Sequence, residues 1–322
     1  MENVIKKDEI LISDSRVNNN RANPFIESNT QDVKLSHLKD DCIIPVFSKD
    51  NETTISHYQF VTSVLEMTNS VFEGFEISDP EIRVSHVIKG RVPSAIGKPA
   101  IELLDEEKTI YYERMAFNIQ IPTISKQVNG NKLMLSLGGV RAYNQENLYS
   151  KKGMEKFKLY IGFKNMVCTN LCISTDGFKN DIRVSSLEAL CESTLALFNR
   201  YNQSEHLNVL ESFHTHALSE SQFAHLIGKL RMANYQQSEI DNPIRLNDTQ
   251  INNVVKNYYG DKNFKCSNNG SISLWNLYNL FTGANRSSYI DSFLERGLNA
   301  YEFTKELVYS IENRSPNWYL DN

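Results

Sequence analysis

The sequence predicts an α+β fold, in which a central, mostly antiparallel sheet over about residues 81–175 precedes a helical C-terminal half. Three observations support this prediction. Apolar and polar residues alternate beyond Ile82, short turns join successive segments, and the apolar spacing becomes helical after Asp181. Strands joined by short turns are most simply antiparallel, and the helices that follow are expected to cover part of the sheet.

The first 40 residues differ from the rest of the chain. They are polar and on balance acidic, contain an Asn cluster at residues 18–20 and show no sustained periodicity. We therefore expect residues 1–40 to form a flexible tail and residues 41–322 to form a single domain. Within this domain the sheet is expected in residues 81–183 and the helical part in residues 184–322.

A helix with a clear start signal precedes the sheet. Ser56 and Gln59 stand at the spacing of a capping box, and apolar residues follow at helical spacing from Tyr58 to Phe72. These signals predict a helix that begins directly after Ser56.

The sheet is expected to contain one long hairpin. Residues 110–124 and 132–143 read as its two strands, and the turn Val-Asn-Gly-Asn at residues 128–131 is typical of a β-hairpin. The segment IRVSHVI predicts a strand before the hairpin, while LYIGF and MVCTNLCIS continue the sheet after it. The stretch KGRVPSAIGK at residues 89–98 contains Pro and Gly, so we expect an irregular loop that lies against the sheet.

The C-terminal half is expected to form several helices. Ser219 and Gln222 have capping-box spacing at the start of one of them. The helical segments are SSLEALCESTLALFNRYN, SESQFAHLIGKLRMANY, LNDTQINNVVKNYY, SISLWNLYNLF and SSYIDSFLERGLNAYEFTKELVYSIENR.

The corner between the last two helices raises the possibility of a binding site. Residues 275–281 are apolar on more than one side, which predicts a largely buried helix. Gly283 is expected at its C-terminal cap, and Ser287 or Ser288 is expected to cap the next helix. A tight corner does not require Arg286, whose side chain could contact a phosphate or a carboxylate beside helix N-terminal amides.

Cysteine content and hydropathy indicate the compartment. The chain lacks an apolar run of about 18 residues and has no long apolar segment near its N-terminus, so we expect a cytoplasmic protein without a membrane partner. Five scattered cysteines argue against a disulfide framework. Cys168 and Cys172 form a lone C-x3-C pair, for which a structural role is favoured over a metal.

No motif assigns a catalytic residue or a cofactor. The segments LSLGGVR and FTGANRSS lack the spacing of nucleotide-binding loops, and no nucleophile stands in a known local pattern. His214, His216 and His225 could meet if their loop folds back on the next helix, but an ordinary polar loop followed by a helix histidine is the favoured interpretation. The sequence therefore predicts no metal site and leaves enzymatic activity undecided.

Charge is distributed unevenly along the chain. Residues 83–183 contain 16 Lys and Arg against 9 Asp and Glu, whereas residues 1–82 contain 7 against 15 and residues 184–322 contain 11 against 15. A basic segment in an acidic protein can mark a nucleic-acid partner. Lysines scattered over solvent-facing strand positions would give the same excess.

Aromatic residues interleave with these cations, as single-stranded nucleic acid requires for stacking and for phosphate contacts. We expect the electrostatic contacts to come from Arg and Lys side chains and the stacking surfaces from two Tyr side chains. The expected residues are Arg83, Lys89, Arg91, Lys98, Arg114, Arg141, Tyr112 and Tyr143.

Five of the segments together resemble a known family. They are IRVSHVIKGRVPSA, KTIYYERMAFNIQIP, GFKNMVCTNLCISTDG, SESQFAHLIGKLRM and SLWNLYNLFTGANRSSYIDSFLERGLNA. In this order they resemble an uncharacterised domain family carried by bacterial plasmids, prophages and integrated conjugative elements, from about Ile43 to Tyr319. The resemblance implies a context of replication, recombination and transfer, and it supplies no catalytic residue.

Two functions are consistent with these observations. The first is a mobile-element accessory protein that binds nucleic acid without sequence specificity, single-stranded DNA above all, in replication or recombination. The second is a protein-interaction factor that binds a host or element-encoded partner through the helical half. The N-terminal tail could cover the basic surface in the first case, because its charge is opposite.

Overall fold

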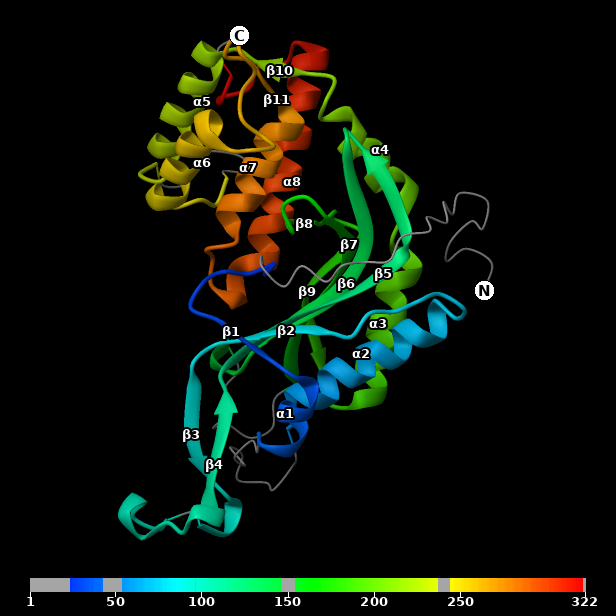
Figure 1. Ribbon diagram of the computed structural model, residues 1–322, viewed down its shortest axis with the longest axis vertical. Coiled ribbons are helices and arrows are strands. Elements are labelled where there is room, and N and C mark those ends of the chain that lie inside the picture. Colours follow the sequence, from blue (N-terminus) through cyan, green and yellow to red (C-terminus); the bar gives the residue numbers. More distant parts are fainter. Residues whose placement is uncertain (1–23, 43–53, 96, 146–153, 237–243, 321–322) are drawn as a thin grey trace.

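A curled antiparallel sheet forms the centre of the protein (Figure 1). The computed structural model describes residues 24–42, 54–95, 97–145, 154–236 and 244–320. The sheet contains β1 (Gln31–Val33), β2 (Glu81–Val84), β5 (Arg114–Val128), β6 (Asn131–Ala142), β7 (Glu155–Asn165), β8 (Leu171–Cys172) and β9 (Phe178–Val184). The strand order is β1-β2-β5-β6-β7-β8, and β9 also pairs with β7. Every pair is antiparallel, which confirms the predicted fold class.

The predicted long hairpin is formed by β5 and β6. Val128 pairs with Asn131 across a turn in which Asn129 and Gly130 both have positive φ, 49° and 80°. Two positive φ values are the signature of the primed turns that match the twist of a hairpin, and Asn-Gly adopts them at low cost. The local sequence therefore determines this part of the sheet.

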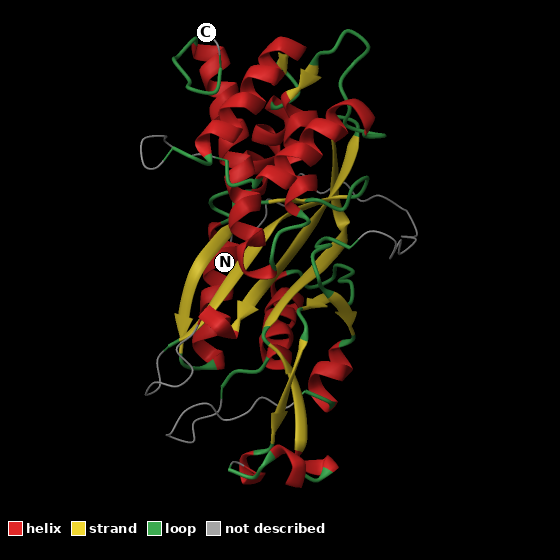
Figure 2. Cartoon of the chain, turned by 90° about the vertical axis from the view of Figure 1, so that its left-hand side faces the viewer, coloured by secondary structure: helices red, strands yellow, loops and turns green. Residues whose placement is uncertain are grey.

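Helices cover both faces of the sheet (Figures 1 and 2). Helices α2 (His57–Val71) and α3 (Leu187–Arg200) pack on one face, where Phe157 of β7 contacts the main apolar core. Helix α8 (Ile290–Asn313) packs on the other face, where Tyr160 of β7 joins a second apolar cluster. Because both faces are covered, β7 is buried along almost its whole length.

The helical half contains further helices, and its start signals are confirmed. The Ser219 side chain accepts from Gln222 N at 3.2 Å, and the Gln222 side chain accepts from Ser219 N at 2.9 Å. The same box joins Ser56 and Gln59 before α2, at 3.0 and 2.8 Å. The remaining helices are α1 (Leu35–Asp40), α4 (Gln203–Ser212), α5 (Glu220–Ala233), α6 (Asp248–Gly260) and α7 (Leu274–Asn285), and a small ribbon joins β10 (Ala217–Leu218) to β11 (Ile272–Ser273). Within the described ranges, no helix combines the length and the apolar character needed to cross a membrane.

Part of the segment that we interpreted as a tail belongs to the folded domain. Strand β1 pairs with β2, and Phe25 and Ile26 are buried in the second apolar cluster beside α8. The interpretation is therefore wrong for residues 24–40, because a two-residue apolar anchor and a three-residue strand are too short to give a periodic signal. Residues 1–23 lie outside the described part of the chain, and so does the predicted cover of the basic surface by the tail.

The stretch at residues 89–98 is not a loop against the sheet. It begins in β3 (Val87–Arg91), which pairs with β4 (Lys108–Tyr112) in a separate two-stranded ribbon. This ribbon projects away from the sheet, and short 3-10 turns at residues 100–102 and 105–107 form part of its free end (Figures 1 and 2). We name residues 87–112 the β3–β4 arm.

The α7–α8 corner is tight, as predicted, but its caps differ. Helix α7 continues through Gly283 to Asn285, and Tyr289 precedes α8 without a side-chain cap. Ser288 donates instead to the Asn285 side chain at 2.8 Å. The Gln250 side chain of α6 donates to the Ala284 carbonyl at 3.2 Å. A side-chain amide from another helix therefore bonds to a carbonyl at the end of α7, where a glycine cap was expected.

Candidate functional site

Ion pairs inside the protein neutralise much of the basic middle segment. Lys158 lies 2.8 Å from Glu295 of α8, Lys164 lies 2.8 Å from Glu81 of β2, and both lysine side chains are buried. The two acids come from the acidic flanks of the chain. A buried cation requires a partner of opposite charge, so these two pairs explain part of the uneven charge by the way the chain folds.

Arg141 is fully buried, which corrects the expectation that it lies on an exposed basic face. Its guanidinium pairs with Glu155, donates to the Ile55 carbonyl and contacts two aromatic rings, 4.5 Å from the centre of Tyr143 and 4.4 Å from that of Phe157. Two cation–π contacts and a carboxylate offset the loss of hydration. Arg141 therefore stabilises the core and is not exposed to contact a phosphate.

The two predicted stacking residues are buried as well. Tyr143 is 1% exposed and stacks on His57, with ring centres 4.6 Å apart. Tyr112 is 4% exposed, and its hydroxyl lies 2.9 Å from His37 Nε2. Neither ring offers a free face to a base, so the predicted aromatic platform is corrected for both residues.

Arg83 and Arg114 are half-buried and contact their own chain. Arg83 donates to the Thr30 carbonyl at 2.8 Å, which ties β2 to the segment before β1. Arg114 lies 3.5 Å from Glu113 and is over the ring of Tyr289, 5.8 Å from its centre. Both side chains keep some exposure, but neither is a free cation.

The other three predicted cations lie on the β3–β4 arm. Lys89 is exposed on β3, and it has no acidic partner among the described residues. Arg91 donates to the Lys98 carbonyl, and Lys98 pairs with Glu107. The structure thus gathers Lys89, Arg91 and Lys98 on one projecting element and separates them from the remaining predicted residues.

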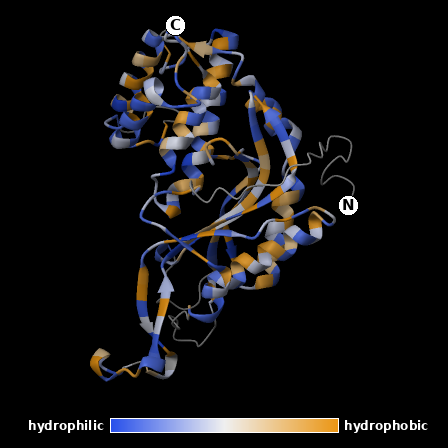
Figure 3. Cartoon of the chain, in the orientation of Figure 1, coloured by the Kyte–Doolittle hydropathy of each residue, from blue (hydrophilic) through white to orange (hydrophobic). Residues whose placement is uncertain are grey.

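The free end of the arm also exposes apolar and acidic residues. Ile101 is 94% exposed and Leu104 is 55% exposed, while Glu102, Asp105 and Glu106 are exposed beside them. Figure 3 shows apolar residues at this end of the molecule. The arm is therefore a mixed surface and not a basic one.

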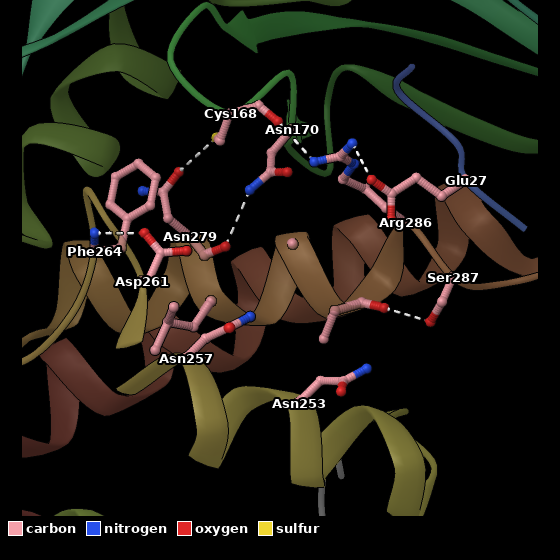
Figure 4. A pocket seen from close by; sticks show the side chains of 13 residues that line it. Glu27, Cys168, Asn170, Asn253, Asn257, Asp261, Phe264, Asn279, Arg286 and Ser287 are labelled. Atoms are coloured by element: carbon pink, nitrogen blue, oxygen red, sulfur yellow. Dashed lines mark hydrogen bonds and ion pairs between the residues drawn. The ribbon is translucent and has the colours of Figure 1, made fainter. Parts of the chain in front are cut away.

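Arg286 contacts an anion that belongs to the protein itself. Its guanidinium pairs with Glu27 and donates to the Cys168 carbonyl at 3.1 Å, while Glu27 N and Ser28 N donate to the Arg286 carbonyl at 2.8 and 3.3 Å. These contacts hold the segment before β1 against the α7–α8 corner. They also form one side of a polar pocket between α6, α7 and the β7–β8 turn, which we name the corner pocket (Figure 4).

Residues of the corner pocket were missed at the level of sequence. Asn170 lies in the β7–β8 turn, and Asn253 and Asn257 lie one turn apart on α6. The spacing of the two α6 residues was visible, but a pair of amides on a helix has the same pattern as an ordinary solvated face. Asn170 gave no signal, because its neighbours in the pocket are distant in the chain.

The histidines and cysteines do not form a metal site in the described residues. His216 lies 3.1 Å from Glu312, His214 is exposed, and no group of three His, Cys, Asp or Glu side chains there could hold a metal ion. Burial raises the pKa of both Cys168 and Cys172 to about 12. Their thiols therefore stay protonated at neutral pH, which agrees with a structural role.

These features define an α+β protein with an antiparallel sheet covered on both faces, a projecting ribbon arm and a polar corner pocket. Residues 5–320 match the model of the family described as "Domain of unknown function, B. Theta Gene description (DUF3871)", and the chain belongs to this family. The resemblance to an uncharacterised family is thereby confirmed. No curated protein and no solved structure matches the chain.

Proposed function

We propose that the protein binds a partner protein through the free end of the β3–β4 arm. The observation that carries this proposal is the exposure of Ile101 and Leu104 together on a projecting element. Single exposed apolar residues are ordinary on protein surfaces, but an apolar pair at the end of an arm adds nothing to the core and is available to a partner. The partner is encoded by the host or by a mobile element that carries the gene.

The charges at the arm specify the chemistry of this partner. Glu102 and Glu106 are exposed beside Ile101 and Leu104, whereas Asp105 pairs with Lys108 at 2.7 Å, so the free end combines an apolar centre with acidic side chains. We infer a partner with an apolar cleft that is bordered by Lys or Arg side chains. This location differs from the helical half expected from the sequence, because Ile101 of the arm is the most exposed of the large apolar side chains among the described residues.

Nucleic acid is a second candidate partner, with single-stranded DNA preferred. The observation that favours it is the exposure of Lys89 on β3, with Arg91 two residues further along the same strand. Alternate residues of a strand point to the same side, so both cations could follow one phosphate backbone. The buried positions of Arg141, Tyr112 and Tyr143 remove much of the remaining support for this candidate.

Two double variants of the arm separate the candidates. Ile101→Asp with Leu104→Asp changes the apolar end, and Lys89→Glu with Arg91→Glu changes the cations of β3. Quantitative affinity purification from nuclease-treated lysate should recover a stoichiometric partner with wild-type protein and with the charge variant, and should lose it with the apolar variant. Retention of that partner by the apolar variant contradicts the proposal.

Fluorescence anisotropy with labelled single-stranded DNA tests the second candidate directly. The second candidate predicts salt-sensitive binding by wild-type protein. This binding should disappear in Lys89→Glu with Arg91→Glu and persist in the apolar variant, and such a result would favour nucleic acid over a protein partner. The proposal predicts no such binding at physiological salt.

A further inference from the structure

The corner pocket is a small cavity that the proposed function does not use. Its volume is about 260 Å³, and it opens between α6, α7 and the β7–β8 turn, with Glu27 at one end (Figure 4). It lies on a different part of the molecule from the β3–β4 arm, so its role is separate from the proposed partner binding.

Charge at the pocket disfavours an anionic ligand. Arg286 is the cation that lines it, and its guanidinium is already paired with Glu27. Asp261 adds a second carboxylate to the lining. Two carboxylates beside one paired guanidinium repel phosphates and carboxylates, so the ligand is not an anion.

Unused hydrogen-bonding groups face the pocket from two sides. On α6, the side chains of Asn253 and Asn257 hydrogen bond to no other described residue. Across the pocket, Asn170 is 2% exposed and donates to the Asn279 carbonyl and the Thr282 hydroxyl, both at 3.0 Å. These two bonds fix the orientation of the amide and leave Asn170 Oδ1 buried without a partner in the described structure.

The same wall also presents an unused donor. Arg286 Nε is buried without a hydrogen-bond partner among the described atoms, and the guanidinium is held by the carbonyl of Cys168, two residues before Asn170. The wall therefore suits a group that both donates to an amide oxygen and accepts from a guanidinium nitrogen. A hydroxyl group does both.

We propose that the corner pocket binds a neutral, polyhydroxylated small molecule of monosaccharide size. Its hydroxyl groups match the amides of Asn170, Asn253 and Asn257 and the carboxylate of Asp261, each of which can bond to a donor. A nucleobase fits less well, because Phe264, the aromatic residue of the lining, is 3% exposed and offers no face for stacking.

A larger side chain at position 283 is expected to block the pocket. It lies in α7 on the pocket lining, and a Cβ added there meets Asn170 Nδ2 at 3.7 Å, an ordinary van der Waals distance. A Cβ at position 283 therefore meets no backbone atom of another element, and the longer side chain of Gly283→Leu is expected to extend into the pocket. The matched control is Gly228→Leu, since Gly228 is an exposed glycine of α5 whose added Cβ meets no atom within 4 Å.

Saturation-transfer NMR with the full-length protein tests the proposal. The probes are glucose, galactose, mannose, N-acetylglucosamine, ribose and inositol, with adenosine, glutamate and inorganic phosphate as other ligand classes. We expect at least one neutral sugar or polyol to bind wild-type protein and Gly228→Leu equally, and to bind Gly283→Leu roughly tenfold more weakly or not at all. Circular dichroism confirms that both variants fold.

Three outcomes would overturn the proposal. They are the absence of binding by every sugar and polyol of the panel, binding that Gly283→Leu leaves unchanged, and binding restricted to adenosine, glutamate or phosphate. Asn257→Leu keeps the test decisive if Gly283→Leu fails to fold, because Asn257 is on the opposite wall and its side chain supports no other described residue.

Discussion

For a single charged residue such as Arg141, the position of the side chain in the fold, and not the residue type, determines its role. Arg141, the cation with the largest number of aromatic contacts among the predicted set, is the one that is fully buried. Glu155 pairs with it and also accepts from Ile55 N at 3.0 Å. Removing this carboxylate would leave an uncompensated cation in the core.

Glu155→Gln should therefore lower the free energy of unfolding by about 3–5 kcal/mol, the cost of breaking a buried pair on one side. Glu211→Gln, which breaks the exposed pair with Lys126 at 3.1 Å, should change it by less than about 1 kcal/mol. Urea denaturation of both variants measures the difference. Equal effects would mean that Arg141 has access to solvent.

His57 gives the protein an acid-sensitive core. Burial, together with the nearby charge of Arg141, lowers the pKa of His57 to about 3, below the ordinary value of about 6.5 that applies in the unfolded chain. Between these values the unfolded state binds a proton that the folded state does not, so stability falls as the pH falls through this window. Burial lowers the pKa of His206 to about 3 in the same way.

His57→Gln should reduce the dependence of the free energy of unfolding on pH by about 1.4 kcal/mol per pH unit between about pH 4 and 5.5. Urea denaturation at several pH values measures the two slopes. His206 keeps its own contribution in both proteins, so the slope of the variant should decrease without reaching zero. Identical slopes would show that His57 is protonated in the folded state.

Among the secondary-structure elements, helix α7 contains Gly283, which was expected to be a C-terminal cap. The structure places it inside the helix with room for a methyl group. Gly283→Ala should stabilise the protein by about 0.5–1 kcal/mol, because Gly is the poorer helix former. Gly130→Ala, at a φ of 80°, should destabilise it by about 1 kcal/mol. If thermal unfolding shows a loss of stability for both variants, Gly283 acts as a helix cap, as the sequence predicts.

The β3–β4 arm should be separable from the stability of the sheet. Of its described residues between Val92 and Leu104, none belongs to the main core, although Ala95 is buried. Replacing residues 93–106 by Asn-Gly should leave the midpoint and cooperativity of thermal unfolding unchanged, since a two-residue turn closes such a ribbon. A large loss of stability would mean that the free end supports the fold and is not reserved for a partner.

At the scale of the whole molecule, local signals predicted what local interactions determine. The capping box of Ser56 and Gln59, the Asn129-Gly130 turn and the change from strand to helix spacing each depend on neighbours in the chain, and the structure contains all three. The α+β class followed from the same signals.

Features that depend on distant residues could not be predicted in this way. Lys158 and Lys164 belong to a basic segment in sequence, but their partners Glu295 and Glu81 lie 137 and 83 residues away. The corner pocket likewise joins Glu27 to helices α6 and α7. Charge and amide content can be read from a sequence, whereas the contacts that neutralise them appear only when the fold is known.

Site-specific photo-crosslinking shows whether the free end of the β3–β4 arm contacts a partner protein, as we propose. A photoreactive residue at position 101, expressed at native level, should give one discrete adduct that resists nuclease and is removed by protease. The same residue at Tyr309, which is exposed on α8, should give none. A nuclease-sensitive adduct at position 101, or equal labelling at the two positions, would rule out a protein partner at the arm.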